Sequence, residues 1–75
     1  MTKAPQFVLC IENTGHPAAL EIGKVYQVLE DAEADRHGLR RVIDESGDDY
    51  LYPDTFFVPI DLPQAGARVF TKRSA

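Results

Sequence analysis

The apolar residues of this chain come in short runs rather than at the three-to-four-residue spacing of an amphipathic helix. The runs are rich in valine, isoleucine, tyrosine and phenylalanine, and turn-forming residues separate them. We interpret five runs as β-strands, namely residues 7–11, 24–30, 38–43, 50–52 and 56–58. In the third of these the alternation breaks at Arg40 and Arg41, which indicates either a bulge or a strand with both faces partly covered.

The segments between the strands carry turn signals of differing strength. Gly47 supplies the positive φ that a hairpin between the third and fourth strands needs. Pro53 ends the fourth strand, a single 3₁₀ turn follows it, and Pro59 ends the fifth strand. Residues 18–22 are expected to form an ordered loop, and residues 31–37 an acidic surface loop.

Five short strands with tight turns predict an all-β fold, a five-stranded small barrel or a pair of packed sheets. We expect residues 1–61 to form this domain and residues 62–75 a basic C-terminal tail. The tail either adds an edge strand at Val69 and Phe70 or stays mobile. A chain of 75 residues allows one domain and favours a shallow groove over a large internal cavity.

Cysteine content and hydropathy indicate the cellular compartment of the protein. Cys10 is the only cysteine, so an internal disulfide is excluded. The longest apolar run is too short to span a bilayer, and no secretory leader is recognisable. We therefore expect a cytoplasmic protein.

The formal net charge of −4 is unevenly distributed. The only charged side chains after Leu62 are Arg68, Lys72 and Arg73, which give the tail +3 and leave −7 for the remainder. An acidic body repels phosphate backbones, so general nucleic-acid binding is disfavoured. The alternative is a small nucleic-acid-associated regulator that uses these three tail residues.

Residues 44–49 are acidic, but they do not fit a calcium loop. An EF-hand counted from Asp44 needs glycine at the sixth position and glutamate at the twelfth, whereas Gly47 is fourth and Thr55 is twelfth. A nucleophile would need Cys10 beside His16 or His37, but the cysteine lies within a strand and both histidines lie in loops. One cysteine and two separated histidines do not make a zinc site either. We expect no catalytic residues, no metal and no cofactor.

The aromatic residues after the hairpin are the remaining candidates for function. In a strand Tyr50 and Tyr52 share one face, and Leu51 takes the other. If Leu51 faces the core, both tyrosines lie outside with Pro53 and Phe56, and these four residues form a protein-recognition surface. In the other interpretation one or both tyrosines turn inward and fill a core that has no tryptophan.

Residues 51–58 (Leu-Tyr-Pro-Asp-Thr-Phe-Phe-Val) resemble the end of an SH3 domain. In that family an apolar strand runs into a proline, one 3₁₀ turn, an aromatic residue and a valine-like residue. The resemblance implies five strongly bent strands in an SH3-like small barrel. Residues 13–22 then correspond to the long first loop, and residues 44–49 to the distal hairpin.

The polyproline groove of SH3 domains uses a tyrosine-rich motif after the first strand and a tryptophan that opens the third strand. Here residues 7–12 read Phe-Val-Leu-Cys-Ile-Glu, and the chain contains no tryptophan. Only Pro53 and either Phe56 or Phe57 match groove positions, which puts polyproline binding in doubt.

The chain also resembles small bacterial and phage proteins of unassigned function over roughly residues 7–60. The shared pattern is Cys-Ile followed by an acid or Asn, then Leu-x-x-Gly-Lys-x-Tyr-x-Val, Asp-x-x-Gly-x-x-Tyr-x-x-Pro and a closing Phe, found here at residues 10–12, 20–28, 44–53 and 57. We predict a non-enzymatic interaction module, a monomer, that binds a protein partner through its aromatic and proline surface.

Overall fold

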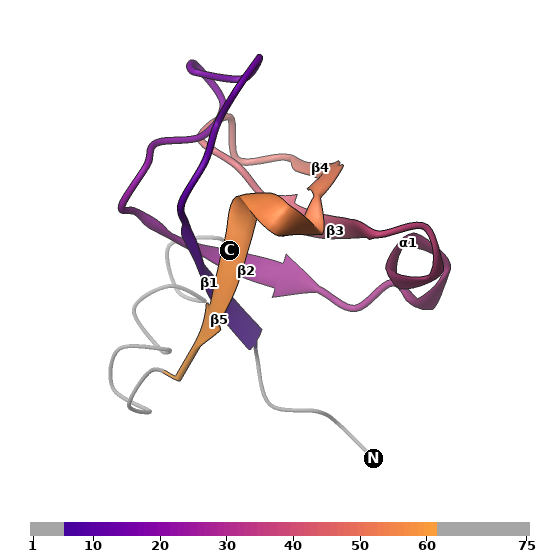
Figure 1. Ribbon diagram of the computed structural model, residues 1–75. Coiled ribbons are helices and arrows are strands. Elements are labelled where there is room, and N and C mark those ends of the chain that lie inside the picture. Colours follow the sequence, from indigo (N-terminus) through magenta and orange to yellow (C-terminus); the bar gives the residue numbers. More distant parts are fainter. Residues whose placement is uncertain (1–5, 62–75) are drawn as a thin grey trace.

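The computed structural model describes residues 6–61, and these residues form one five-stranded antiparallel sheet (Figure 1). The strands are β1 (Gln6–Cys10), β2 (Val25–Leu29), β3 (Leu39–Ile43), β4 (Asp49–Pro53) and β5 (Phe57–Ile60), in the sheet order β4-β3-β2-β1-β5. A 3₁₀ turn, η1 (Asp54–Phe56), precedes β5. The all-β fold, the five strands and the 3₁₀ turn before the last strand are thus confirmed. The tail 62–75, with its expected edge strand, lies outside the described residues.

The two outer strands of the sheet follow one another along the chain. In Figure 1 the orange ribbon runs from β4 through η1 and turns into β5, so the sheet curls towards itself. Within residues 6–61 no ladder joins β4 to β5, and the sheet is therefore not closed. This arrangement is compatible with a barrel-like shape that stays open between its two edges.

The expected loop at residues 31–37 contains a short helix, α1 (Ala32–Arg36), and the prediction of an irregular segment was wrong. Asp31 caps this helix, because its Oδ1 accepts a hydrogen bond of 3.0 Å from the Ala34 N–H. The other carboxylate oxygen of Asp31 accepts from Arg41 Nε on β3 at 2.9 Å, and Ala34 is buried. The helix is therefore held by its cap and by the strand beside it.

In the described part of the chain no helix is long and apolar enough to cross a bilayer.

The last strand also differs from the prediction. Phe56 belongs to η1, and β5 continues through Pro59 to Ile60 instead of ending at the proline. Pro59 pairs with Val8 in the ladder to β1. Proline is tolerated there because β5 is at the edge of the sheet that residues 6–61 form, where a missing amide hydrogen leaves no neighbouring strand without a partner.

The arginine pair in β3 does not produce a bulge against β4. The register runs without a break from the Leu39–Pro53 pair to the Ile43–Asp49 pair. Val42 is fully buried and its neighbours are half-buried, so both faces of β3 are partly covered. Of the two explanations for the broken alternation, the structure supports the second.

The core is formed by side chains of the sheet, of η1 and of the first loop, residues 13–22. Leu20 comes from that loop and is as completely buried as the central strand residues. The cluster consists of Val8, Cys10, Leu20, Tyr26, Val28, Val42, Tyr52, Phe56 and Phe57. The ordered loop expected at residues 18–22 thus covers one end of the sheet.

Candidate functional site

A pocket of about 400 Å³ lies between the first loop, the turn after β3 and strand β4. Its lining residues are His16, Ala19, Asp44, Ser46, Asp48, Tyr50, Leu51 and Tyr52. We call it the hairpin pocket. The turn and β4 follow one another in the sequence, and only folding brings the first loop against them.

The turn that forms one wall is organised by Asp44. Its Oδ1 accepts hydrogen bonds from the Ser46 N–H at 2.9 Å and from the Ser46 hydroxyl at 2.5 Å. The Gly47 N–H donates to the Asp44 carbonyl at 3.0 Å, and Gly47 has a φ of 87°, where a residue with a Cβ would be strained. An aspartate that bonds its own following backbone is a frequent device in turns. The local sequence therefore fixes this wall.

The Asp44 carboxylate also holds β4, because its Oδ2 accepts a hydrogen bond of 2.6 Å from the Tyr52 hydroxyl. Both side chains are buried, with 6% of Asp44 and 4% of Tyr52 exposed. Burial by itself raises the pKa of Asp44, but the hydrogen bonds from Ser46 and Tyr52 outweigh it and the pKa lies below its ordinary value. Burial, and then the hydrogen bond to Asp44, raise the pKa of Tyr52. Asp44 is thus a buried carboxylate whose hydrogen bonds compensate its charge.

The opposite wall comes from the first loop, which is held by its own hydrogen bonds. The His16 N–H donates to the Asn13 carbonyl at 2.8 Å, and the Leu20 N–H donates to the His16 carbonyl at 3.0 Å. The His16 ring lies edge-on to Tyr52, with ring centres 4.9 Å apart and an angle of 84° between the planes. Edge-to-face contacts of this kind are favourable because the positive edge of one ring meets the negative face of the other. The exposed histidine is therefore held over a buried tyrosine.

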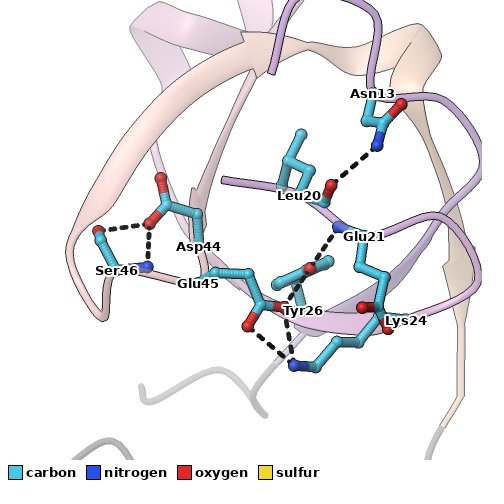
Figure 2. Close-up of polar contacts among 8 residues, drawn as sticks. All are labelled: Asn13, Leu20, Glu21, Lys24, Tyr26, Asp44, Glu45 and Ser46. Carbon is cyan, nitrogen blue, oxygen red and sulfur yellow. Dashed lines mark hydrogen bonds and ion pairs between the residues drawn. The ribbon is translucent and has the colours of Figure 1, made fainter. Parts of the chain in front are cut away.

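A second tyrosine–carboxylate pair joins the turn to the first loop and to β2 (Figure 2). The Tyr26 hydroxyl donates to Glu45 Oε2 at 2.5 Å and accepts from the Glu21 N–H at 2.8 Å. Lys24 Nζ lies 2.7 Å from the same Glu45 oxygen. The Glu45 N–H also donates to the Ala19 carbonyl at 2.9 Å. The neighbours Asp44 and Glu45 thus bind tyrosines from two different strands, and this fixes the turn against the loop.

Among the four residues predicted for partner binding, the structure separates two exposed ones from two buried ones. Tyr50 is 58% exposed and Pro53 is exposed, whereas Tyr52 and Phe56 belong to the core. Tyr52 turns inward, as the second interpretation of this strand described, and its hydroxyl is occupied by Asp44. Tyr50 and Tyr52 line the hairpin pocket, but Pro53 and Phe56 do not.

The sequence did not indicate the other residues of the pocket as a group. Asp44 and Ser46 carry a local turn signal, since an Asx turn needs an aspartate two residues before the bonded amide. His16 has no such signal, because its contact with Tyr52 bridges two segments that are distant in the chain. Only the register of the strands and the path of the first loop bring it there.

Asp48 is an exposed acidic side chain that lines the hairpin pocket. Within residues 6–61 its carboxylate makes no hydrogen bond or ion pair, while Asp44 and Glu45 bind tyrosines. Asp49 is paired with Arg41 at 2.7 Å. Across the same residues no three histidine, cysteine, aspartate or glutamate side chains gather around a common point that could hold a metal ion.

Cys10 lies in the core with no exposed surface. Its Sγ donates to the Glu12 carbonyl at 3.2 Å, and burial raises the pKa of the thiol. A buried thiol with a raised pKa is a poor nucleophile at neutral pH. The nucleic-acid alternative rests on three residues of the tail, Arg68, Lys72 and Arg73, which lie outside the described residues.

Comparisons with protein-family models, with curated proteins and with solved structures find no match.

Proposed function

We propose that this protein is a non-enzymatic interaction module that binds a protein partner through the hairpin pocket and the adjoining surface of β4. The observation that carries the proposal is the exposure of two large side chains on an edge strand at the mouth of a pocket. Tyr50 is 58% exposed and Leu51 is 39% exposed, and both line the pocket. Tyrosine beside an apolar residue is typical of the centre of protein interfaces.

The anchoring of this surface also supports a binding role. The turn is held by Asp44 and the first loop by its contacts to Glu45 and Tyr52, so the pocket walls exist before a partner arrives. A preformed site loses less conformational entropy when it binds. We infer that the partner meets a rigid wall on each side and the two exposed side chains of β4 between them.

The proposal includes an SH3-like barrel, a monomeric state and a cytoplasmic location. The strand order β4-β3-β2-β1-β5, with η1 between β4 and β5, supports the fold assignment. Pro59 in the edge strand β5 lacks the amide hydrogen that pairing with another chain would use, which favours a monomer. The free thiol of Cys10 suits a reducing compartment.

The test is a selection of phage-displayed random peptides on the immobilised full chain, followed by affinity measurements on two matched variants. Leu51→Ala removes an apolar side chain from edge strand β4, and Val58→Ala removes one of similar exposure (37%) from edge strand β5. We expect Leu51→Ala to weaken the selected peptides by about fivefold, or ~1 kcal/mol. We expect Val58→Ala to bind as the unaltered chain does. Equal binding by all three proteins would rule out the β4 surface.

A further inference from the structure

The hairpin pocket combines negative charge with aromatic rings. Of its lining residues two are aspartates, three carry aromatic rings and none is lysine or arginine. The charge of the surrounding body has the same sign, because residues 6–61 contain twelve acidic and four basic side chains, a formal net charge of −8. A negative concave surface concentrates cations and repels anionic ligands such as phosphates.

The described basic side chains do not neutralise this pocket. Lys24 is paired with Glu45, Arg36 with Glu33, and Arg41 with Asp31 and Asp49. Arg40 is half-buried in β3 and is not among the lining residues. Asp48 therefore offers its carboxylate to an incoming ligand without first breaking an ion pair within residues 6–61.

The arrangement suits an organic cation better than a metal ion. Asp44 is buried and both of its carboxylate oxygens already accept hydrogen bonds, whereas Asp48 is exposed and its carboxylate accepts none within residues 6–61. One available carboxylate does not provide the several oxygen ligands that calcium or magnesium needs. A carboxylate beside exposed aromatic faces does provide what a guanidinium or ammonium group uses, namely a charge-assisted hydrogen bond and a cation–π contact.

We propose that the hairpin pocket binds the arginine or lysine side chain of a basic peptide segment in the protein partner. The cationic group pairs with Asp48, and the aliphatic stem of the side chain packs on Tyr50 and Leu51 at the pocket mouth. This inference rests on the proposed function, because it names the chemistry of the partner at the same surface. The occupant is a peptide segment rather than a free amine, since the exposed edge strand β4 runs beside the pocket and offers contacts on either side of the bound residue.

The test is an NMR titration of the full chain with three acetylated and amidated heptapeptides, Gly-Val-Thr-Xaa-Thr-Val-Gly, in which Xaa is Arg, Glu or norleucine. We expect the Arg peptide to shift the backbone amides of residues 44–52, with a dissociation constant on the order of 1 mM. Glu at the same position should abolish the shifts, and norleucine should weaken binding about fivefold or more. Nα-acetylarginine methyl amide, which has the same single charge, should bind more weakly than the Arg peptide.

Two pairs of variants distinguish binding in the pocket from non-specific attraction of the cation to the negatively charged protein. Asp48→Asn removes the proposed partner of the cation, and Asp35→Asn removes the same charge from α1, at the other end of β3. We expect the first to weaken the Arg peptide about fivefold and the second to have no measurable effect. Tyr50→Phe keeps the aromatic face and should bind normally, whereas Tyr50→Leu should bind about threefold more weakly.

Several results would overturn the proposal. Equal binding of the three peptides at residues 44–52 would leave the interaction module standing but exclude a cationic specificity. Equal loss in Asp48→Asn and Asp35→Asn would show a diffuse charge effect instead of a site. Sedimentation of the chain alone accompanies the titration, and a dimer that Asp48→Asn dissociates would assign the pocket to a second copy of the chain.

Discussion

Strands β1 and β4 are both five residues long, yet they meet solvent in opposite ways. In β1 only Gln6 is exposed, and the neighbours Phe7 and Val8 are both buried although they point to opposite faces. In β4 every residue except Tyr52 is exposed. Within residues 6–61, β1 pairs on both sides, with β2 and β5, whereas β4 pairs only with β3.

This difference indicates that β1 contributes mainly to the stability of the sheet, whereas β4 offers the surface for binding. β1 is covered on both faces and contributes Val8 and Cys10 to the core. β4 is joined to the core through a single buried side chain, Tyr52, and through the hydrogen bond of that side chain to Asp44. Apart from Asp49, which pairs with Arg41, the exposed residues of β4 are thus available to contact a partner.

The largest expected effect comes from placing a charge at matched positions of the two strands. Val8→Asp buries a carboxylate without a partner, which costs several kcal/mol. The total stability of a chain this size is roughly 4–11 kcal/mol, so we expect Val8→Asp to be largely unfolded. Leu51→Asp adds the same group to an exposed position and should cost less than about 1 kcal/mol. Urea unfolding followed by circular dichroism measures both.

If the two variants lost equal stability, the contrast between β1 and β4 would be wrong. Val8→Ala serves as a milder variant that stays folded, and its free energy of unfolding should fall by about 2 kcal/mol.

A smaller effect distinguishes the two tyrosines of β4. Tyr52→Phe removes the hydroxyl that donates to Asp44 Oδ2 and leaves a buried carboxylate oxygen without that donor. We expect the free energy of unfolding to fall by about 1–3 kcal/mol. Tyr50→Phe changes an exposed side chain and should stay within about 0.5 kcal/mol of the unaltered chain. A thermal or urea transition of each variant, measured at neutral pH, gives the comparison.

The smallest effect is the response of this anchor to acid. The pKa of Asp44 is lowered in the folded protein, so its contribution to stability is complete above the ordinary carboxyl pKa of about 3.9. That contribution is lost as the pH falls through the lower folded-state pKa. We therefore expect the free energy of unfolding to decrease on acidification below about pH 4, and less steeply in Asp44→Asn.

The same titration has a direct readout in the folded protein. The carboxyl carbon of Asp44, followed by NMR, should titrate below its ordinary pKa in the unaltered chain and at a higher pH in Tyr52→Phe, because the hydroxyl no longer stabilises the charged form. If the pKa of Asp44 were the same in Tyr52→Phe, the hydrogen bond from Tyr52 to Asp44 would not stabilise the carboxylate, and this prediction would be wrong.

The sequence located most elements but not the contacts between them. Residues 24–30 predicted β2 to within a residue at each end, because a run of β-forming side chains is a local property. The turn at Gly47 and the 3₁₀ turn after Pro53 were also predicted, from residues that restrict φ by themselves. α1 was missed although Asp31 is a local N-cap signal, and the rest of its support comes from the Asp31–Arg41 contact with β3.

The candidate site was predicted only in part. Tyr50 is at the surface, but Tyr52 and Phe56 belong to the core, and alternation along β4 alone left both arrangements open. Tyr50 and Tyr52 occupy alternate positions, which place them on the same face, and they still differ because the first loop covers only the second of them.

The sequence alone determined where this chain turns and where it extends, because glycine, proline and β-forming residues act on the backbone at their own positions. The tertiary structure decided which tyrosine is buried, which carboxylate accepts the hydrogen bond from its hydroxyl and which histidine packs against its ring. These outcomes depend on what packs against each face of the sheet. The residues that pack there come from distant parts of the chain, so a local sequence pattern does not predict these contacts.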